Sequence, residues 1–436
     1  MSIPLYNLFS PIHDENSIDH SLEKMITELE GKLGEEFLEI SEDEIKNYSS
    51  PLIFIKSGGV EGYFKEIYQH FQEPYTILAS DTNNSLAASL EILTFLKQQG
   101  LKAEIIHGDV SYLASRINII QKAAAAKQRL NGINVGAIGK PSDWLIASNV
   151  DYRKVENTFG IKVIELEITE LLAEIEKVTA SPNLLADLKN GVQERNIKSL
   201  YQEAPDEKSL DGALNIYLAL KNICIKYHLQ GLTIRCFDLL NTVYNTGCIA
   251  LALLNDEGII SACEGDLPAL IIPSSFNNAA LLSMMILNTL TEEPVFMANP
   301  SSIDTKSNQI ILAHCTLPLS MADLFTLNTH FESKIGVGIH GEIRSGEATI
   351  FRLNADLKRY FVSGITILEN QYKDNLCRTQ IKVKMHESAQ YLLLNPMGNH
   401  HLICKGDYTS LVNYFMDLRG LHNCLKHPFD HNISND

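Results

Sequence analysis

Residues 75–107 read YTILASDTNNSLAASLEILTFLKQQGLKAEIIH, and this stretch decides the fold class. Tyr75 to Ser80 is a short apolar run typical of a buried strand, and Ala103 to His107 is a second one. Between them, Asn84 to Gln99 has the pattern of a helix, and Gly100 follows it as a C-terminal cap would. Strands that alternate with helices in this way predict a parallel sheet with helices on both faces.

The same alternation extends in both directions from this stretch. We therefore expect an α/β protein with two Rossmann-like parallel-sheet domains, over residues 1–132 and 133–293. In the second domain, the apolar runs Leu232 to Phe237 and Cys248 to Leu254 have the length of strands. The chain is long enough for such an organisation, because 436 residues exceed the size of one compact core.

The pattern changes from about Pro294. Short β-rich runs separated by Gly, Asn, Ser and Asp follow one another, and this is typical of an antiparallel barrel or sandwich. Asp407 to Arg419 predicts a closing helix. A third domain is therefore expected over residues 294–436.

Composition and charge exclude several classes of partner. The formal net charge of −17 argues against nucleic acid and against an anionic membrane surface, whereas a small polyhydroxyl ligand is compatible with it. The N-terminus has no basic start and no apolar signal core, and no run of about eighteen apolar residues occurs. We expect a cytoplasmic protein whose eight cysteines, none in a CxxC pair, are reduced and mostly buried.

The first candidate for chemistry is Ala262-Cys263-Glu264-Gly265-Asp266, which follows a predicted strand. Two carboxylates separated by one glycine can both face a cleft at the C-terminal edge of a parallel sheet, where ligands usually bind. Carboxylates at such a place ligate metals or move protons. A solvated turn or a helix N-cap is the plainer alternative for the same residues.

Histidines supply the other candidates. His314 ends an apolar strand, 314 − 264 = 50 residues after Glu264, and it can be a metal ligand or a hydrogen-bonded core residue. His400 and His401 follow the turn residues Gly398-Asn399, and adjacent strand residues point to opposite faces, so only one of the two can face a given site. One carboxylate and two histidines together would form a divalent cation site, with ligands that suit Mn²⁺ or Mg²⁺.

These motifs resemble, in order and approximate spacing, those of the L-fucose isomerase and L-arabinose isomerase family. The matching segments are Ala262 to Asp266, Phe296-Met297, Ala313-His314-Cys315 and His400-His401, together with Ile138 to Trp144 and the hairpin Arg344 to Thr349. The resemblance covers the whole chain in architecture, and it implies that the third domain is an antiparallel β-barrel.

The resemblance implies a sugar isomerase that interconverts aldoses and ketoses through an enediol. It further implies a Mn²⁺ or other divalent cofactor, a small-molecule sugar as substrate, and a homo-oligomer, either a trimer or a hexamer. Glu264 and Asp266 would then be catalytic, and Glu264, His314 and His401 would hold the metal. The implied substrate-binding residues are Asn299, His400, Trp144 and Arg344.

One departure from the family stands out. The family has a second acidic ligand after the Phe-Met pair, but here Phe296-Met297 is followed by Ala298-Asn299. An asparagine carbonyl can coordinate a cation, but it carries no charge and cannot act as a base. Two alternatives therefore stay open, a sugar-binding protein without turnover and a different enzyme, such as a lyase or an epimerase, on the same scaffold.

Other enzyme classes lack support in the sequence. No GxGxxG follows a strand, and Gly136-Ala137-Ile138-Gly139 has the wrong spacing for a dinucleotide-binding loop. No GxSxG occurs, so a serine hydrolase is not indicated.

Overall fold

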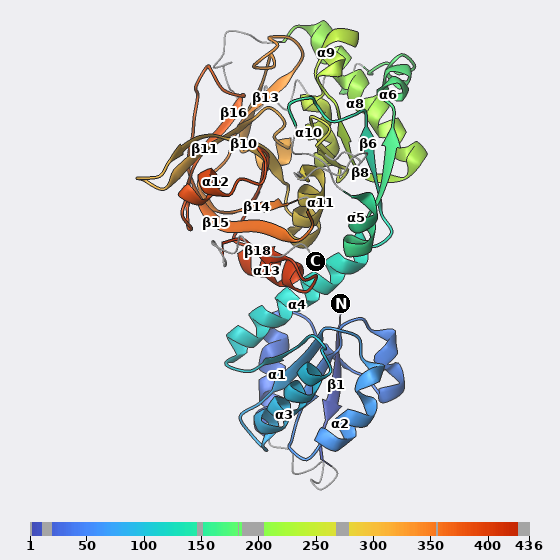
Figure 1. Cartoon of the computed structure of the whole chain (residues 1–436), viewed down its shortest axis with the longest axis vertical. Coiled ribbons are helices and arrows are strands. Elements are labelled where there is room, and N and C mark those ends of the chain that lie inside the picture. Colours follow the sequence, from blue (N-terminus) through green and yellow to red (C-terminus); the bar gives the residue numbers. More distant parts are fainter. Residues whose placement is uncertain are drawn as a thin grey trace. The chain divides into compact units, whose positions relative to one another are not determined.

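The computed structural model describes residues 2–10, 20–145, 151–181, 183–184, 205–266, 279–354 and 356–425. The chain folds as two compact units, residues 1–125 and residues 126–436 (Figure 1). The three domain ranges expected from the sequence stay a prediction. Within the described ranges, no helix has both the length and the apolar character needed to cross a bilayer.

The first unit contains a five-stranded parallel sheet in the order β2-β1-β3-β4-β5. Its strands are β1 (Ile3–Leu8), β2 (Phe37–Glu39), β3 (Leu52–Ile55), β4 (Tyr75–Ala79) and β5 (Ala103–Ile106). The helices are α1 (His20–Leu33), α2 (Glu61–Ile67), α3 (Ser85–Gln98) and α4 (Val110–Leu130), with 3-10 turns η2 (Glu42–Asn47) and η3 (Tyr68–His70). Every residue of β3 and β4 is buried, as expected for central strands covered on both faces.

The second unit begins with a four-stranded parallel sheet in the order β7-β6-β8-β9. Its strands are β6 (Asn134–Ile138), β7 (Lys162–Leu166), β8 (Leu229–Ile234) and β9 (Ile260–Ala262). The accompanying helices are α5 (Tyr152–Phe159), α6 (Ile168–Ile175), α8 (Glu207–Tyr227), α9 (Asp238–Thr242), α10 (Cys248–Asp256) and α11 (Ala280–Thr291).

One strand expected from the sequence is wrong. Cys248 to Leu254 lies within helix α10, and all of its residues are buried apart from Leu253. A helix that is buried on nearly every side loses the 3.6-residue polar period, so its apolar run looks like a buried strand.

The remaining strands form a closed antiparallel barrel. Six strands follow one another in the order β14-β17-β10-β11-β16-β15, and β15 pairs back with β14. They are β10 (Phe296–Asp304), β11 (Gln309–His314), β14 (Gly346–Leu353), β15 (Arg359–Asn370), β16 (Thr379–Met385) and β17 (His401–Lys405). The expected fold class, with two parallel-sheet α/β parts and a C-terminal barrel, is confirmed.

Smaller elements complete the barrel part of the chain. The strands β12 (Leu324–Asn328) and β13 (Gly338–Glu342) form a separate two-stranded sheet, and β18 (His422–Asn423) adds to β15. The 3-10 turn η4 (Leu319–Met321) and the helices α12 (Gln390–Leu394) and α13 (Thr409–Asp417) accompany them. Helix α13 matches the closing helix expected from the sequence.

Helix α11 joins the parallel sheet of the second unit to the barrel. It contacts β8 and β9 on one side and β14 and β17 on the other (Figure 1). Ten of its twelve residues are buried, which is why it is apolar all round. The end of β9 and the start of β17 are therefore held close together.

Candidate active site

The loop after β9 carries the central residues of the site. Glu264 and Gly265 both have left-handed backbone conformations, with φ of 63° and 66°. A side chain at Gly265 would place its Cβ 2.8 Å from the carbonyl oxygen of Lys140, so only glycine fits there. The Gly265 N–H donates to the Ile234 carbonyl, and the Glu264 carbonyl accepts from the Ser142 N–H. The loop is therefore fixed at the C-terminal edge of the sheet, against the ends of β6 and β8.

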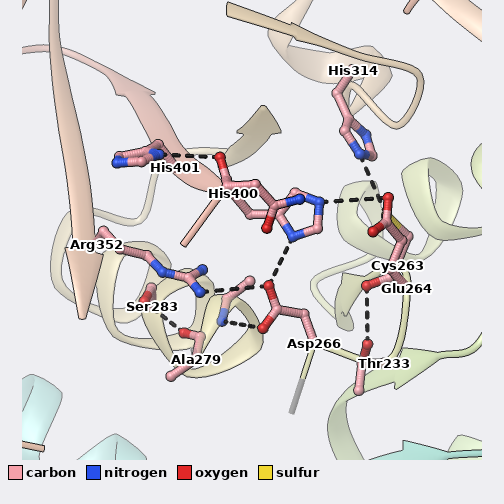
Figure 2. Close-up of polar contacts among 12 residues, drawn as sticks. Thr233, Cys263, Glu264, Asp266, Ala279, Ser283, His314, Arg352, His400 and His401 are labelled. Carbon is pink, nitrogen blue, oxygen red and sulfur yellow. Dashed lines mark hydrogen bonds and ion pairs between the residues drawn. The ribbon is translucent and has the colours of Figure 1, made fainter. Parts of the chain in front are cut away.

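Four side chains converge beside this loop. Cys263, Glu264, His314 and His400 each offer one ligand atom, and these atoms all lie within 4.8 Å of one another (Figure 2). The Cys263 Sγ lies 3.5 Å from the His314 Nε2, and the His400 Nε2 lies 3.6 Å from the Glu264 Oε1. All four residues are buried. His314 is the last residue of β11 and His400 directly precedes β17, so the barrel supplies the imidazoles and the α/β part supplies the carboxylate.

A buried row of charged groups stands behind His400. The His400 Nδ1 donates to the Asp266 Oδ2 over 2.8 Å, and the Arg352 Nη2 lies 3.5 Å from the same oxygen (Figure 2). The side chains of His400, Asp266 and Arg352 are all completely buried. The Arg352 Nε donates to the Met397 carbonyl, whereas Nη1 and Nη2 have no hydrogen-bond partner within the described residues. Asp266 therefore fixes the ring of His400, with the Nε2 directed at Glu264.

Aromatic rings border the open side of Glu264. The Trp144 indole N–H donates to the Glu264 Oε2 over 2.8 Å, and half of the Trp144 side chain is exposed. The ring of Trp144 meets Phe237 edge-on at 4.7 Å, and Phe237 meets His330 in the same way at 5.8 Å. Such a border of rings beside a polar cluster is the usual lining of a small-molecule site.

The charges of the site are set by its burial and by its ion pairs. Burial by itself raises the pKa of Glu264, but the positive charge of His400 and a hydrogen bond from the Trp144 N–H lower it to about 2. Burial likewise raises the pKa of Asp266, and Arg352 and His400 bring it down to about 2. For His400, burial lowers the pKa, but the two carboxylates raise it to about 9. The metal-free site therefore holds two carboxylates and one imidazolium at neutral pH.

His314 is uncharged, in contrast to His400. Burial and the charge of His400 lower the pKa of His314 to about 3, so its ring is neutral at physiological pH. Its Nδ1 is hydrogen-bonded to the Thr316 hydroxyl, and its Nε2 faces Cys263. A neutral imidazole whose second nitrogen is held by an outer partner is what a metal ligand requires.

The pKa of His400 predicts how stability depends on pH. Below its unfolded pKa of about 6.5, His400 is protonated in both states, and its ion pairs stabilise the fold fully. Above that pH the unfolded chain releases the proton while the folded chain keeps it up to about pH 9. We expect this contribution to fall by about 3 kcal/mol in total between pH 6.5 and 9.

Urea unfolding of the metal-free protein at pH 6, 7.5 and 9 measures this loss. His400→Gln serves as the reference, because the glutamine does not titrate. The difference in unfolding free energy between the wild type and this variant is expected to shrink as the pH rises. A difference that stays constant over this range would contradict the ion pairing described above.

The structure brings together most of the residues proposed from the sequence. Glu264, Asp266, His314, His400 and Trp144 are joined by the contacts given above. Their roles stay predictions.

Three proposed residues are not joined to this cluster by the contacts given above. His401 is directed away from Glu264 (Figure 2), its Nδ1 lies 3.2 Å from the Asn399 carbonyl oxygen, and its ring packs edge-on against Phe361 of the barrel core. The metal-facing position expected for His401 is instead taken by His400, because neighbouring residues of a strand point to opposite faces. Asn299 pairs with Ala313 in the barrel, and Arg344 is exposed and 3.4 Å from Asp323.

Sequence reasoning missed two residues of the site. Cys263 precedes Glu264 directly, but the sequence does not single it out as a ligand. Arg352 lies in the apolar strand β14, and a completely buried arginine is a signal that a carboxylate must lie beside it. The sequence does not show which of the 53 acidic residues is the partner.

The donor set fits a divalent metal ion. Glu264 offers an oxygen, His314 and His400 offer nitrogens, and Cys263 offers a sulfur. The His400 Nε2 is buried, faces the Glu264 Oε1 at 3.6 Å and makes no hydrogen bond within the described residues, so it can bind a cation once its proton is released. The cluster could therefore hold a metal ion.

The chain is similar to enzymes that act on a sugar. It is 21% identical over 314 residues to the sulfoquinovose isomerase of Alkalicoccus urumqiensis. The aligned region covers 70% of this chain and 67% of that protein. It is 29% identical over 245 residues to that of Clostridium sp. strain MSTE9, and 22% identical over 248 residues to that of Priestia aryabhattai. These two matches cover 55% and 56% of this chain, but only 51% of each relative. No protein-family model matches. The similarities support a relationship to sugar isomerases, without pointing to fucose or arabinose isomerases in particular.

Proposed function

We propose that this protein is an aldose–ketose isomerase with its active site at the cluster of Cys263, Glu264, His314 and His400. The observation that carries the proposal is the convergence of these buried donors at the C-terminal edge of a parallel sheet. The similarity to proteins named sulfoquinovose isomerase supports the same reaction class.

The reaction needs an acid/base group and a means to stabilise negative charge. Conversion of an open-chain aldose into a ketose moves one proton between C1 and C2 through an enediol, while negative charge develops on the neighbouring oxygens. A divalent cation, when bound, supplies a Lewis acid and a template for those two oxygens. The resemblance to the fucose and arabinose isomerases favours Mn²⁺ as that ion.

Glu264 is the residue we assign to the proton transfer. Its low pKa keeps it ionised at neutral pH, so it can accept a proton from a sugar carbon. The Trp144 N–H holds one of its oxygens, which leaves the other oxygen facing His400. Burial raises the pKa of Glu264, and the charge of His400 opposes this effect. When His400 loses its proton, the pKa of Glu264 rises and the carboxylate becomes a stronger base.

The rings of Trp144 and Phe237 are the proposed sugar-binding face, and Trp144 also orients Glu264. The resemblance favours L-fucose or L-arabinose as substrate, whereas the relatives favour sulfoquinovose, a hexose with a sulfonate on C6. A homo-oligomer, either a trimer or a hexamer, stays a prediction that sedimentation equilibrium can measure.

The test is product formation from a panel of sugars. Metal-stripped protein is incubated in D₂O with L-fucose, L-arabinose or sulfoquinovose and with Mn²⁺, Co²⁺, Zn²⁺ or Mg²⁺, and proton NMR follows the products. We expect one sugar to yield its ketose in a metal-dependent reaction. No conversion of any sugar with any ion would overturn the proposal. Ligand-induced thermal stabilisation without product would instead indicate a sugar-binding protein.

A further inference from the structure

The site holds fewer acidic ligands than the proposed metal chemistry needs. Phe296-Met297 is followed by Ala298-Asn299, so no second carboxylate comes after this pair, and Ala298 is completely buried opposite His401 in the β10–β17 pairing. Asp266 does not fill this role, because its Oδ2 binds His400 and lies beside Arg352, and its Oδ1 lies 3.5 Å from the Ala280 N–H. Glu264 is therefore the single carboxylate among the clustered ligand atoms.

The thiol of Cys263 can supply a second negative charge to the cluster. The side chain is buried, and its Sγ is one of the four ligand atoms that lie within 4.8 Å of one another. A thiolate and one carboxylate together carry two negative charges, as two carboxylates would. The thiolate and the carboxylate can therefore balance the two positive charges of a divalent cation, although no acidic residue directly follows Met297.

Two of the six distances between the ligand atoms match tetrahedral coordination. Zinc binds nitrogen and oxygen at about 2.0–2.1 Å and sulfur at about 2.3 Å, so neighbouring ligand atoms of a tetrahedron lie roughly 3.3–3.6 Å apart. The Cys263 Sγ and the His314 Nε2 are 3.5 Å apart, and the Glu264 Oε1 and the His400 Nε2 are 3.6 Å apart.

Both imidazoles are held ready for a metal. The Nδ1 of His400 is bound to Asp266 and that of His314 to Thr316, so the two Nε2 atoms face the cluster. Outer partners of this kind usually orient metal-binding histidines. The His400 Nε2 is completely buried and makes no hydrogen bond within the described residues, its ion-pair partner Glu264 Oε1 being 3.6 Å away, so it has room for a ligand independently of Cys263.

We propose that the Cys263 thiolate is a metal ligand that replaces the missing carboxylate, and that the site consequently prefers Zn²⁺ or Co²⁺ to Mn²⁺ or Mg²⁺. On binding, the Cys263 thiol and the His400 imidazolium each release one proton to solvent, and the sulfur and the His400 Nε2 bond to the cation with no change of oxidation state. Sulfur ligands select these ions, whereas oxygen ligands suit Mn²⁺ and Mg²⁺. The inference deepens the proposed function, since it names the ion class of the same site, but its test does not depend on turnover.

The experiment is a titration of the metal-stripped full-length protein with Co²⁺. We expect a saturable one-to-one signal with a thiolate-to-cobalt charge-transfer band in the near ultraviolet, and Zn²⁺ should abolish it by displacement. Cys263→Ser should lose the band and should weaken Zn²⁺ binding by more than the roughly 10–100-fold that loss of an outer partner costs. Its affinity for Mn²⁺ should change by less than about tenfold.

Cys236→Ser is the matched control. Cys236 is a buried thiol that interacts with Cys263, but it is not among the clustered ligand atoms. This variant should keep both the band and the Zn²⁺ affinity. A band that survives in Cys263→Ser, or that is absent from the wild type, overturns the inference.

A second measurement uses the wild type alone, so it tests the inference even if Cys263→Ser does not fold. X-ray absorption of the wild-type zinc protein should show one sulfur at about 2.3 Å among nitrogen and oxygen ligands. A shell of nitrogen and oxygen alone overturns the inference. If the sulfur ligand is found but no sugar is converted, the proposed function fails while the metal site stands.

Discussion

Glu264→Gln is expected to lower kcat/KM for the substrate sugar by about 10³-fold, within the 10²–10⁴-fold range typical of a lost acid/base group. The amide cannot accept the proton from the sugar carbon, and it removes one negative charge from the cluster. Glutamine has the same shape, tolerates the same left-handed backbone at this position no worse than glutamate, and still offers an oxygen to the Trp144 N–H. Steady-state kinetics by NMR or by a coupled ketose assay give the change.

The melting temperature separates a chemical effect from a structural one. His400 keeps its hydrogen bond to Asp266 in this variant but loses its ion pair with Glu264, so the thermal transition of the metal-free protein should fall, while staying cooperative and above the assay temperature. Glu387→Gln, which neutralises an exposed glutamate in the same unit, should leave both kinetics and melting unchanged. Retention of at least a tenth of the activity by Glu264→Gln would remove this residue from the proton transfer.

Asp266→Asn is expected to lower the free energy of unfolding by about 3–5 kcal/mol, the range found when one partner of a buried ion pair is removed. The guanidinium of Arg352 is completely buried, and within the described residues its Nη atoms have no hydrogen-bond partner that could compensate. In the same substitution the His400 Nδ1 would exchange a charged acceptor for the neutral oxygen of an amide. Chemical denaturation at pH 7 without metal measures the loss.

A double-mutant cycle tests whether the loss arises from the unpaired arginine. Combining Asp266→Asn with Arg352→Met removes both charges, so the pair of substitutions should cost less than the sum of the single ones. Asp304→Asn, which changes an exposed aspartate, is the control. It should lower the free energy of unfolding by much less than Asp266→Asn does. A loss of under about 1 kcal/mol in Asp266→Asn would show that the ion pair contributes little to the fold.

Much of the architecture could be predicted because neighbouring residues determine it. The strand–helix–strand stretch from Tyr75 to Ile106 contains its own cap and its own apolar runs, and the structure has β4, α3 and β5 there. Helix α10 could not be recognised in the same way. It is packed on nearly all sides, so the periodicity that would distinguish it from a strand is absent.

The candidate site shows the same division. Glu264 could be found because it follows a strand of a parallel sheet, and the C-terminal ends of such strands gather at one edge. His314 could be found as a histidine that ends an apolar strand. The choice between His400 and His401 could not be made, since alternation along a strand places them on opposite faces without saying which face meets Glu264. The pairing of Arg352 with Asp266 joins residues 86 positions apart (352 − 266), and no local pattern reports such a contact.

The central claim is that Glu264, His314 and His400 bind one cation at which the sugar reacts. A crystal structure of the protein soaked in Zn²⁺ or Mn²⁺, with anomalous diffraction recorded at the absorption edge of the metal, tests this most directly. The account predicts one strong anomalous peak within about 2.0–2.4 Å of the Glu264 carboxylate and of both Nε2 atoms. A saturated crystal without a peak among these three side chains, or with its only peak elsewhere, would contradict it.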